Sequence, residues 1–206
     1  THMDGADQVA EQIRLTNPGA EVHKVHWDAY QRVSTIKGNT YPEVNSLIRR
    51  QMTDGALVMN YTGHGATYTL SHEFVLQTED FSSSRSQNLP LWVTAACDVM
   101  PFDGQITNIG ETAVLNPQGG ALAFYGTTRT VYANRNKYMN RAFLQRVLSL
   151  KDGKPMPIGE AHRLAQNDLV LGNVIGYDSK GQPIKETDLT TNRLQYALLG
   201  DPAMPL

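Results

Sequence analysis

The amino-acid sequence predicts an α/β fold in three layers, with a mainly parallel sheet covered by helices. Segments with helical periodicity alternate along the chain with short apolar runs, as expected where helices connect parallel strands. Several of those runs are apolar on both faces, which is typical of strands buried between two layers of helices. The chain has 206 residues, of which 40% are apolar, so it can bury a core without disulfide bonds or metal ions.

Composition excludes several classes of protein. Charged residues make up 18% of the chain, and the 17 glycines and 10 prolines form no repeat, which excludes a coiled coil and a collagen-like chain. The net charge of −2 predicts no basic surface, so neither nucleic acid nor an anionic membrane is an expected partner. No run approaches the ~20 apolar residues of a membrane-spanning helix. The single cysteine excludes disulfide bonds within the chain and Cys-rich zinc sites.

The first half of the chain alternates helix and strand signals. Apolar residues spaced three and four apart predict helices, Asn17-Pro18-Gly19 ends the first of them, and Pro42 lies near the start of the second. The expected elements are a helix over 4–16, a short strand over 21–27, a loop over 28–40, a helix over 42–53 and a buried strand over 56–61.

The second half continues the alternation. Asn108 and Glu111 have the spacing of a capping box, and Asn116-Pro117 ends the helix that they begin. No repeat or linker divides the chain, so a single domain over 1–206 is expected. The expected elements are a polar turn or short helix over 78–87, a strand over 91–97, a helix over 108–115, a strand over 121–125, helices over 136–150 and 158–171, a loop-rich stretch over 172–190 and an apolar run over 194–199.

Two glycines flank His64 directly after the strand expected over 56–61. Glycine lets the backbone adopt conformations that other residues resist and exposes backbone N–H groups to a ligand. A histidine in that setting can accept a proton from a nucleophile, and the N–H of Gly65 can point at a developing oxyanion. A lone Gly-His-Gly also occurs as an ordinary turn, so this motif alone does not decide between the two interpretations.

Cys97 ends the strand expected over 91–97. A lone cysteine there is commonly a small core residue, and it acts as a nucleophile only with a base close by. Because the carboxyl ends of neighbouring parallel strands share one edge of a sheet, the order of the strands places Cys97 and His64 at the same edge. A cysteine and a histidine in this arrangement match a nucleophile and its base, which neither residue indicates alone.

Other catalytic motifs are absent from the sequence: it contains no phosphate-binding P-loop, no Gly-x-Ser-x-Gly and no His-Glu-x-x-His. His72-Glu73 either lines the site or forms a solvated turn. His23, His26 and His162 are expected at the surface. The opening Thr1-His2-Met3 looks like a cloning remnant or a cut inside a longer protein, so His2 is left out of the candidate site.

Six segments of the sequence fit one known pattern. They are Asn60–Gly65, Leu89–Asp98 with Phe102-Asp103, Gly110-Glu111, Asn116–Ala121, Thr128–Asn134 and the closing Leu198–Ala203. Together they resemble the gingipain-type cysteine peptidases, family C25, of the caspase-like clan, whose pattern is His-Gly after one strand and Ala-Cys after the next. The later segments look closest to the branch that serves as signal peptidase and sortase of the type IX secretion system.

The resemblance implies a caspase-like sandwich and a role for each matching residue. Cys97 would be the nucleophile, His64 the general base and then acid, and the N–H groups of Gly65 and Cys97 the oxyanion hole. It also implies protein substrates, namely exported cargo with its C-terminal sorting domains, at the outside or outer-membrane surface of a bacterium. It implies no required cofactor and leaves room for a structural calcium ion. The residues that would line the substrate pocket are Thr127, Thr128, Arg129 and Thr130.

Family catalytic domains carry a further α/β half upstream of the segment that resembles this chain from Asp4 onward. We therefore expect a C-terminal catalytic subdomain that lacks the upstream strand and whose partner is the upstream half of its own longer chain. An acidic residue that orients His64 could lie in that half, so none is named. The alternative function is a catalytically silent scaffold or docking module of a secretion system, which rapid alkylation of Cys97 near neutral pH would contradict.

The four pocket residues present three hydroxyls and one cation but no carboxylate. An enzyme that prefers Arg or Lys supplies a buried carboxylate, because an unpaired buried cation is costly. Asp98 and Asp103 are the nearby candidates, and either could instead bond its own loop. We therefore expect small or polar substrate residues before the scissile bond. The alternative interpretation of Arg129 is that it braces the loop and never meets substrate.

Overall fold

A four-stranded sheet lies at the centre of the computed structural model, which describes residues 2–36, 38–170, 177 and 179–206. Its strand order is β11-β8-β7-β3, and the strands are β3 (Val58–Thr62), β7 (Leu91–Ala95), β8 (Ala123–Thr127) and β11 (Tyr196–Gly200). The first three run parallel, and β11 is antiparallel to β8. This confirms the predicted mainly parallel sheet.

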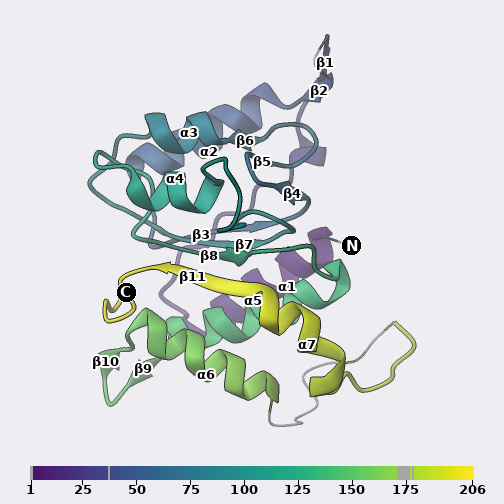
Figure 1. Ribbon diagram of the computed structural model, residues 1–206, viewed down its shortest axis with the longest axis vertical. Coiled ribbons are helices and arrows are strands. Elements are labelled where there is room, and N and C mark those ends of the chain that lie inside the picture. The colour runs from purple at the N-terminus through teal and green to yellow at the C-terminus, as the bar shows by residue number, and fades with distance from the viewer. Residues whose placement is uncertain (1, 37, 171–176, 178) are drawn as a thin grey trace.

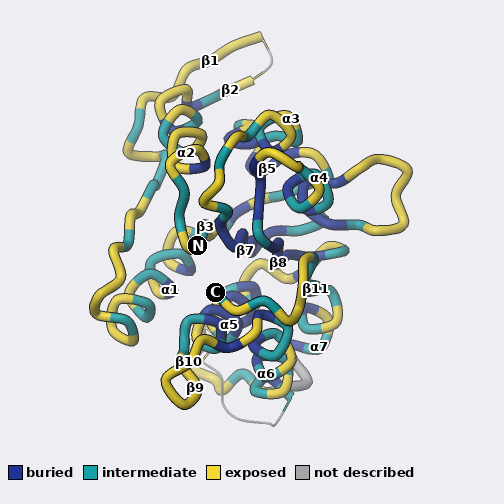
Figure 2. Tube along the Cα trace, turned by 90° about the vertical axis from the view of Figure 1, so that its left-hand side faces the viewer, coloured by how far each residue is buried: buried dark blue, intermediate teal, exposed yellow. Residues whose placement is uncertain are grey.

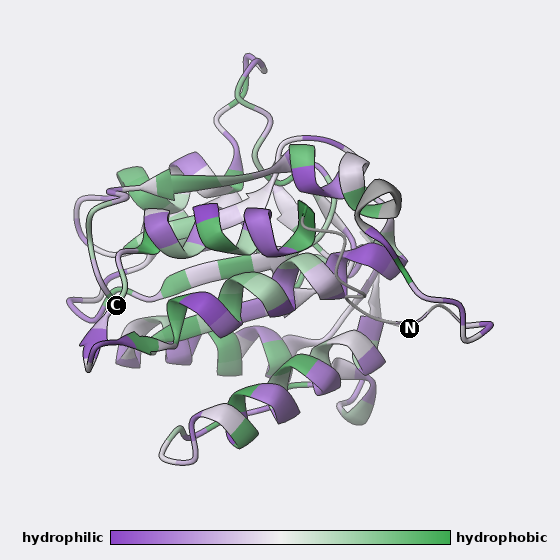
Figure 3. Ribbon diagram, turned by 90° about the horizontal axis from the view of Figure 1, so that it is seen from below, coloured by the Kyte–Doolittle hydropathy of each residue, from purple (hydrophilic) through white to green (hydrophobic). Residues whose placement is uncertain are grey.

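Helices cover both faces of the sheet (Figure 1). One face carries α2 (Pro42–Asp54), α3 (Thr78–Ser83) and α4 (Ile109–Leu115). The other carries α1 (His2–Thr16), α5 (Ala133–Val147), α6 (Ile158–Val170) and α7 (Glu186–Gln195). Polar and apolar residues alternate along the helices of this second face, so each helix turns one side to the sheet (Figure 3).

The core has one apolar layer on each side of the sheet, and the strands and the inner sides of the helices are buried (Figure 2). Side chains of a strand point alternately to the two faces. Val93 of β7 therefore packs with Tyr125 and Phe143 on the side of α5, whereas Trp92 packs with Phe81 and Phe124 on the other side.

The remaining short elements are hairpins and one 3₁₀ turn. The strands β4, β5 and β6 matter for the site, because this antiparallel ribbon follows His64 directly. The bounds of these elements are η1 (Trp27–Ala29), β1 (Val33–Thr35), β2 (Gly38–Thr40), β4 (Gly65–Ala66), β5 (Thr69–Leu70), β6 (Leu76–Gln77), β9 (Leu150–Lys151) and β10 (Lys154–Pro155).

Three expectations about the elements are wrong. Residues 21–27 form no strand, because this segment pairs with no described strand; Lys24 and His26 instead contact Asp7 of α1. The stretch 28–40, expected to be a loop, contains the β1–β2 hairpin. Part of 172–190 lies outside the described residues, but the helix α7 begins within it at Glu186, and Leu189 is buried in the core.

His162 is not the surface residue that its helical pattern indicates. Its ring packs edge-on against Tyr125, with centroids 5.6 Å apart, and lies 6.4 Å from Phe143. This burial lowers the pKa of His162 below its ordinary value.

Candidate active site

The register of two neighbouring strands brings His64 and Cys97 to one place. The last register pair of β3 and β7 is Thr62 with Ala95, and each candidate residue lies two positions beyond its member of that pair. The Gly63 N–H donates to the Ala95 carbonyl at 3.2 Å, so the strands stay joined past the ladder. Cys97 thus lies beyond the end of its strand, at the same carboxyl edge of the sheet as His64.

Gly65 lets the two loops touch. A Cβ atom at this position would lie 2.8 Å from the Cys97 carbonyl oxygen, 2.7 Å from Cγ1 of Val99 and 2.9 Å from Cβ of Ala96. Real Cβ atoms do not approach other atoms so closely, so any larger residue would push the histidine loop away from Cys97. The backbone that follows His64 is therefore in contact with the backbone that carries Cys97.

Two hydrogen bonds hold the backbone of His64. Its carbonyl accepts from the Tyr61 hydroxyl at 2.6 Å and from the Ser71 N–H at 2.9 Å. Burial raises the pKa of the Tyr61 hydroxyl, so this group remains a protonated donor. The side chain of His64 is exposed, as a base that meets a substrate must be.

Two histidine rings contact the His64 imidazole. His72 stacks on it, with centroids 4.6 Å apart and planes 9° from parallel. His2 approaches edge-on, with centroids 4.9 Å apart. The sequence leaves open whether His72-Glu73 lines the site or forms a solvated turn, and the resemblance of Thr1-His2-Met3 to a cloning remnant places His2 outside the candidate site.

Cys97 lies in a sharp turn after β7. Its half-buried thiol donates to the Val131 carbonyl, with 3.5 Å between sulfur and oxygen. The next residue, Asp98, has a φ of 53°, which residues with a Cβ rarely adopt. The Asp98 N–H donates to the Arg129 carbonyl at 3.3 Å, so the turn is held against the segment that follows β8.

The first two predicted pocket residues support the site from inside. Thr127 is fully buried, and its hydroxyl donates to the Ala96 carbonyl at 2.5 Å. The expectation that this hydroxyl lines the pocket is therefore wrong; it anchors the residue before Cys97. The Thr128 hydroxyl donates to Gln195 at the end of α7, 3.1 Å from the side-chain oxygen.

The other two predicted pocket residues are exposed and engage the nearby carboxylates. Arg129 donates to Asp103 at 2.5 Å, and Thr130 donates to Asp98 at 2.7 Å. The hydrogen bond from Arg129 holds the pKa of the Asp103 carboxyl below its usual value. Asp98 and Asp103, the two candidate partners for a basic substrate residue, are thus hydrogen-bonded to the predicted pocket residues themselves.

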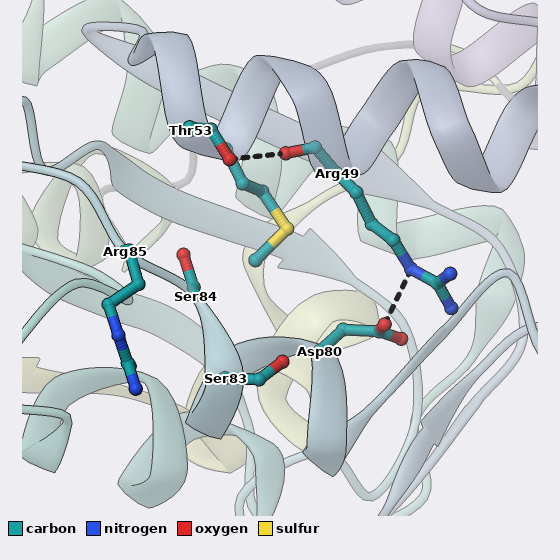
Figure 4. A pocket seen from close by; sticks show the side chains of 7 residues that line it. Arg49, Thr53, Asp80, Ser83, Ser84 and Arg85 are labelled. Atoms are coloured by element: carbon teal, nitrogen blue, oxygen red, sulfur yellow. Dashed lines mark hydrogen bonds and ion pairs between the residues drawn. The ribbon is translucent and has the colours of Figure 1, made fainter.

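A hollow of about 180 Å³ lies elsewhere and contains neither His64 nor Cys97 (Figure 4). It lies at the ends of α2 and α3, which lead toward the amino ends of β3 and β7. Arg49 and Asp80 pair across it at 2.6 Å, so its one carboxylate is already neutralised. The residues that line it are Arg49, Met52, Thr53, Asp80, Ser83, Ser84 and Arg85.

The described residues contain no group of three or more His, Cys, Asp or Glu side chains that could hold a metal ion. Because calcium also accepts backbone and amide carbonyl oxygens as ligands, the structural calcium ion stays a prediction. None of the helices over the described ranges is long and apolar enough to cross a membrane.

Comparison with known proteins places this geometry in a family. The model of peptidase family C25 matches residues 1–206. The solved structure of gingipain R (RgpB), an Arg-specific cysteine proteinase, is 19% identical with a TM-score of 0.57, covering 79% of this chain and 36% of that one. A complex of the pro- and mature domains of RgpB from Porphyromonas gingivalis is 16% identical with a TM-score of 0.57, covering 79% and 37%.

A further structure, described as a protease, is 18% identical with a TM-score of 0.52, covering 76% of this chain and 36% of that one. The chain thus spans little more than a third of the length of these structures. The likeness confirms the caspase-like α/β sandwich. No curated protein sequence matches the chain significantly. Since the family model matches from the first residue to the last, the chain belongs to peptidase family C25.

Proposed function

We propose that this chain is the C-terminal catalytic part of a longer cysteine peptidase, in which Cys97 and His64 cleave peptide bonds of protein substrates. The observation that carries the proposal is the parallel register of β3 and β7, which puts both residues two positions beyond one pair of the ladder. The contact between Gly65 and the Cys97 backbone supports it, because it joins the two loops directly.

The reaction follows from these groups. The His64 imidazole takes the thiol proton of Cys97, and the thiolate attacks the carbonyl carbon of the scissile bond. The N–H groups of Gly65 and Cys97 are proposed to receive the resulting oxyanion. Collapse breaks the C–N bond, and the imidazolium returns the proton to the departing amine. Water, deprotonated by His64, then attacks the thioester and releases the acid and the thiol.

We infer that the residue before the scissile bond is small or polar rather than strictly basic. Asp103 is already paired with the Arg129 guanidinium, and the Thr130 hydroxyl bonds Asp98 to the same segment, as expected of carboxylates that brace the loop rather than bind a substrate cation. Scanning a peptide library at this position with the full-length enzyme tests the inference. A dominant Arg or Lys preference that disappears in Asp98→Asn or Asp103→Asn would show that it is wrong.

We further propose that the peptidase acts as a sortase, which transfers the cleaved substrate to an acceptor. Its support is the resemblance of the later segments to PorU-like proteins of the type IX secretion system, which act on exported cargo at the bacterial surface. In that role an amine, rather than water, attacks the thioester, so the cargo is transferred to an acceptor. Mass spectrometry of products formed with and without an added amine distinguishes transfer from hydrolysis.

Alkylation of Cys97 tests the catalytic pair in the chain itself. A thiol that an imidazole deprotonates reacts quickly with iodoacetamide near pH 7, whereas an inert core thiol does not. We expect His64→Ala to slow the reaction at least 10-fold. His23→Ala is the matched control, because His23 is an exposed histidine that pairs with Glu21. Equal rates in wild type and His64→Ala would favour the silent scaffold.

Peptide cleavage by the full-length protein tests the nucleophile. We expect Cys97→Ala to abolish turnover, a loss of several orders of magnitude, because the thioester can no longer form. The melting temperature checks that the fold is retained, since the change removes only a half-buried sulfur. Wild-type turnover by the Cys97→Ala protein would refute the proposed mechanism.

A further inference from the structure

A second histidine is stacked on the proposed catalytic base, and nothing in the proposed mechanism uses it. We propose that His72 is a positioning residue: its ring holds the His64 imidazole in the plane from which it reaches Cys97. This inference rests on the proposed function. It is carried by the stack of the two rings, with centroids 4.6 Å apart and planes 9° from parallel, and by the backbone of the turn that presents His72.

The turn between β5 and β6 is built in an unfavourable conformation. Ser71 has a φ of 70° and Phe74 a φ of 52°, in the left-handed region that residues with a Cβ avoid. Local hydrogen bonds hold it there: the Val75 N–H donates to the Leu70 carbonyl at 3.1 Å, and the Glu73 N–H donates to the Ser71 hydroxyl oxygen at 3.1 Å. Strain that a structure maintains at a site of this kind points to a role.

The same turn is tied to the backbone of His64. The Ser71 N–H donates to the His64 carbonyl at 2.9 Å, directly before His72 in the chain. The Ser71 hydroxyl donates to the Glu73 carboxylate, so that acid braces the turn. One anchor thus fixes the main chain of His64, and the neighbouring residue of the same turn fixes its ring.

Stacking, rather than a hydrogen bond to a carboxylate, orients the His64 ring. Among the described residues, no carboxylate is hydrogen-bonded to the His64 ring, and its ring contacts are with His72 and His2. An exposed imidazole without a partner rotates among several rotamers, only some of which face the thiol. A flat ring packed against one face of the imidazole excludes the rotamers that do not face the thiol. A larger fraction of molecules is then ready to react.

Four variants separate stacking from other effects. His72→Phe keeps a flat ring, His72→Gln keeps a polar side chain without a ring, and His72→Ala removes both. His23→Ala is the control for loss of an exposed histidine. His72 is exposed, so we expect all four proteins to fold.

The first readout needs no activity. Ring currents of a stacked neighbour shift the NMR signals of the His64 ring protons upfield. We expect this shift to persist in His72→Phe and to be lost in His72→Ala and His72→Gln. An unchanged His64 signal in His72→Ala would overturn the proposal, whether or not the protein is a peptidase.

The second readout is reactivity. We expect His72→Ala and His72→Gln to lower the alkylation rate of Cys97, and kcat of the full-length enzyme, roughly 10- to 100-fold with KM almost unchanged. His72→Phe should recover most of the loss. If His72→Phe is as impaired as His72→Ala, stacking is not the cause and the inference fails. If His64→Ala itself leaves alkylation unchanged, the proposed function fails, while the NMR readout still decides whether His72 holds His64.

Discussion

Gly65 is the residue at which the two halves of the candidate site meet. It has no Cβ, and the space that a Cβ would take is filled by the Cys97 carbonyl and the side chain of Val99. The position has no positive φ, so the requirement for glycine comes from space alone. A single methyl group therefore tests whether the contact between the loops sets the geometry of His64 and Cys97.

We expect Gly65→Ala to lower thiol reactivity at least 10-fold and to cost about 1–3 kcal/mol of stability, because the loops must separate to admit the methyl group. Iodoacetamide kinetics and urea denaturation measure the two effects. Gly19→Ala is the matched control, since a Cβ at Gly19 meets no atom within 4 Å. If Gly65→Ala behaves like Gly19→Ala in both measurements, the contact has no such role.

At the scale of elements, α4 connects the cysteine turn to the rest of the fold. Its N-cap, Asn108, accepts from the Glu111 N–H at 2.8 Å, and Glu111 accepts from the Asn108 N–H at 3.1 Å. Asn108 is fully buried and also donates to the Pro101 carbonyl at 3.3 Å. One side chain therefore fixes both the start of the helix and the loop that leads to it from Cys97.

Asn108→Ala removes both contacts of the side chain, to the Glu111 N–H and to the Pro101 carbonyl. We expect a loss of about 1–2 kcal/mol, because the cap is lost and buried backbone groups are left without partners. Glu111→Gln keeps a side-chain oxygen for the capping box and should cost much less. Urea denaturation of both variants measures the difference; equal stability of Asn108→Ala and wild type would contradict the role of this cap.

The contact between α6 and the sheet predicts a pH dependence. Burial lowers the pKa of His162 in the folded protein below its ordinary value of 6.5, so the unfolded state takes up the proton first as the pH falls. This group's contribution to stability is therefore present above pH 6.5 and is lost below it. His162→Phe keeps a ring against Tyr125 but cannot titrate, so the stability of wild type relative to this variant should fall on acidification. A constant difference from pH 8 to roughly pH 5 would contradict this.

At the scale of the whole molecule, the sheet of the described residues ends at β3, which pairs with β7 on one side. Asn60 in this strand is exposed. An open strand edge is a template for pairing with another chain. The similar solved structures are roughly twice as long as this chain, and the resemblance to their family predicts the neighbouring strand in an upstream half.

We expect the isolated chain to cleave peptides at least 10-fold more slowly than the full-length protein and to associate as its concentration rises. The proposed upstream half would supply the neighbour of β3 and an acid that orients His64. Turnover assays and analytical ultracentrifugation of both proteins measure this. A monomeric chain with full turnover would show that the upstream half is dispensable.

Local patterns determined most of the elements. The Asn108–Glu111 box, the apolar periodicity of α2, α5 and α6, and the apolar runs of β3, β7 and β8 all depend on neighbours within a few residues, so the sequence reports them directly. Parallel strands end at one edge, so the sequence also placed His64 and Cys97 together. The strand predicted over 21–27 was wrong because a strand forms only when another strand pairs with it, and the local sequence does not report the partner.

Only the tertiary structure decided what surrounds the candidate pair. The stack of His72 on His64 depends on two left-handed residues in a turn, which no sequence pattern announced. Thr127 looked like a pocket residue, but the side-chain alternation of β8 and the position of Ala96 bury its hydroxyl. The sequence by itself determined the family pattern, the layers of the fold and the two candidate residues of the site. The side chains around His64 and Cys97 come from distant parts of the chain. Their positions are therefore determined only when those parts pack together.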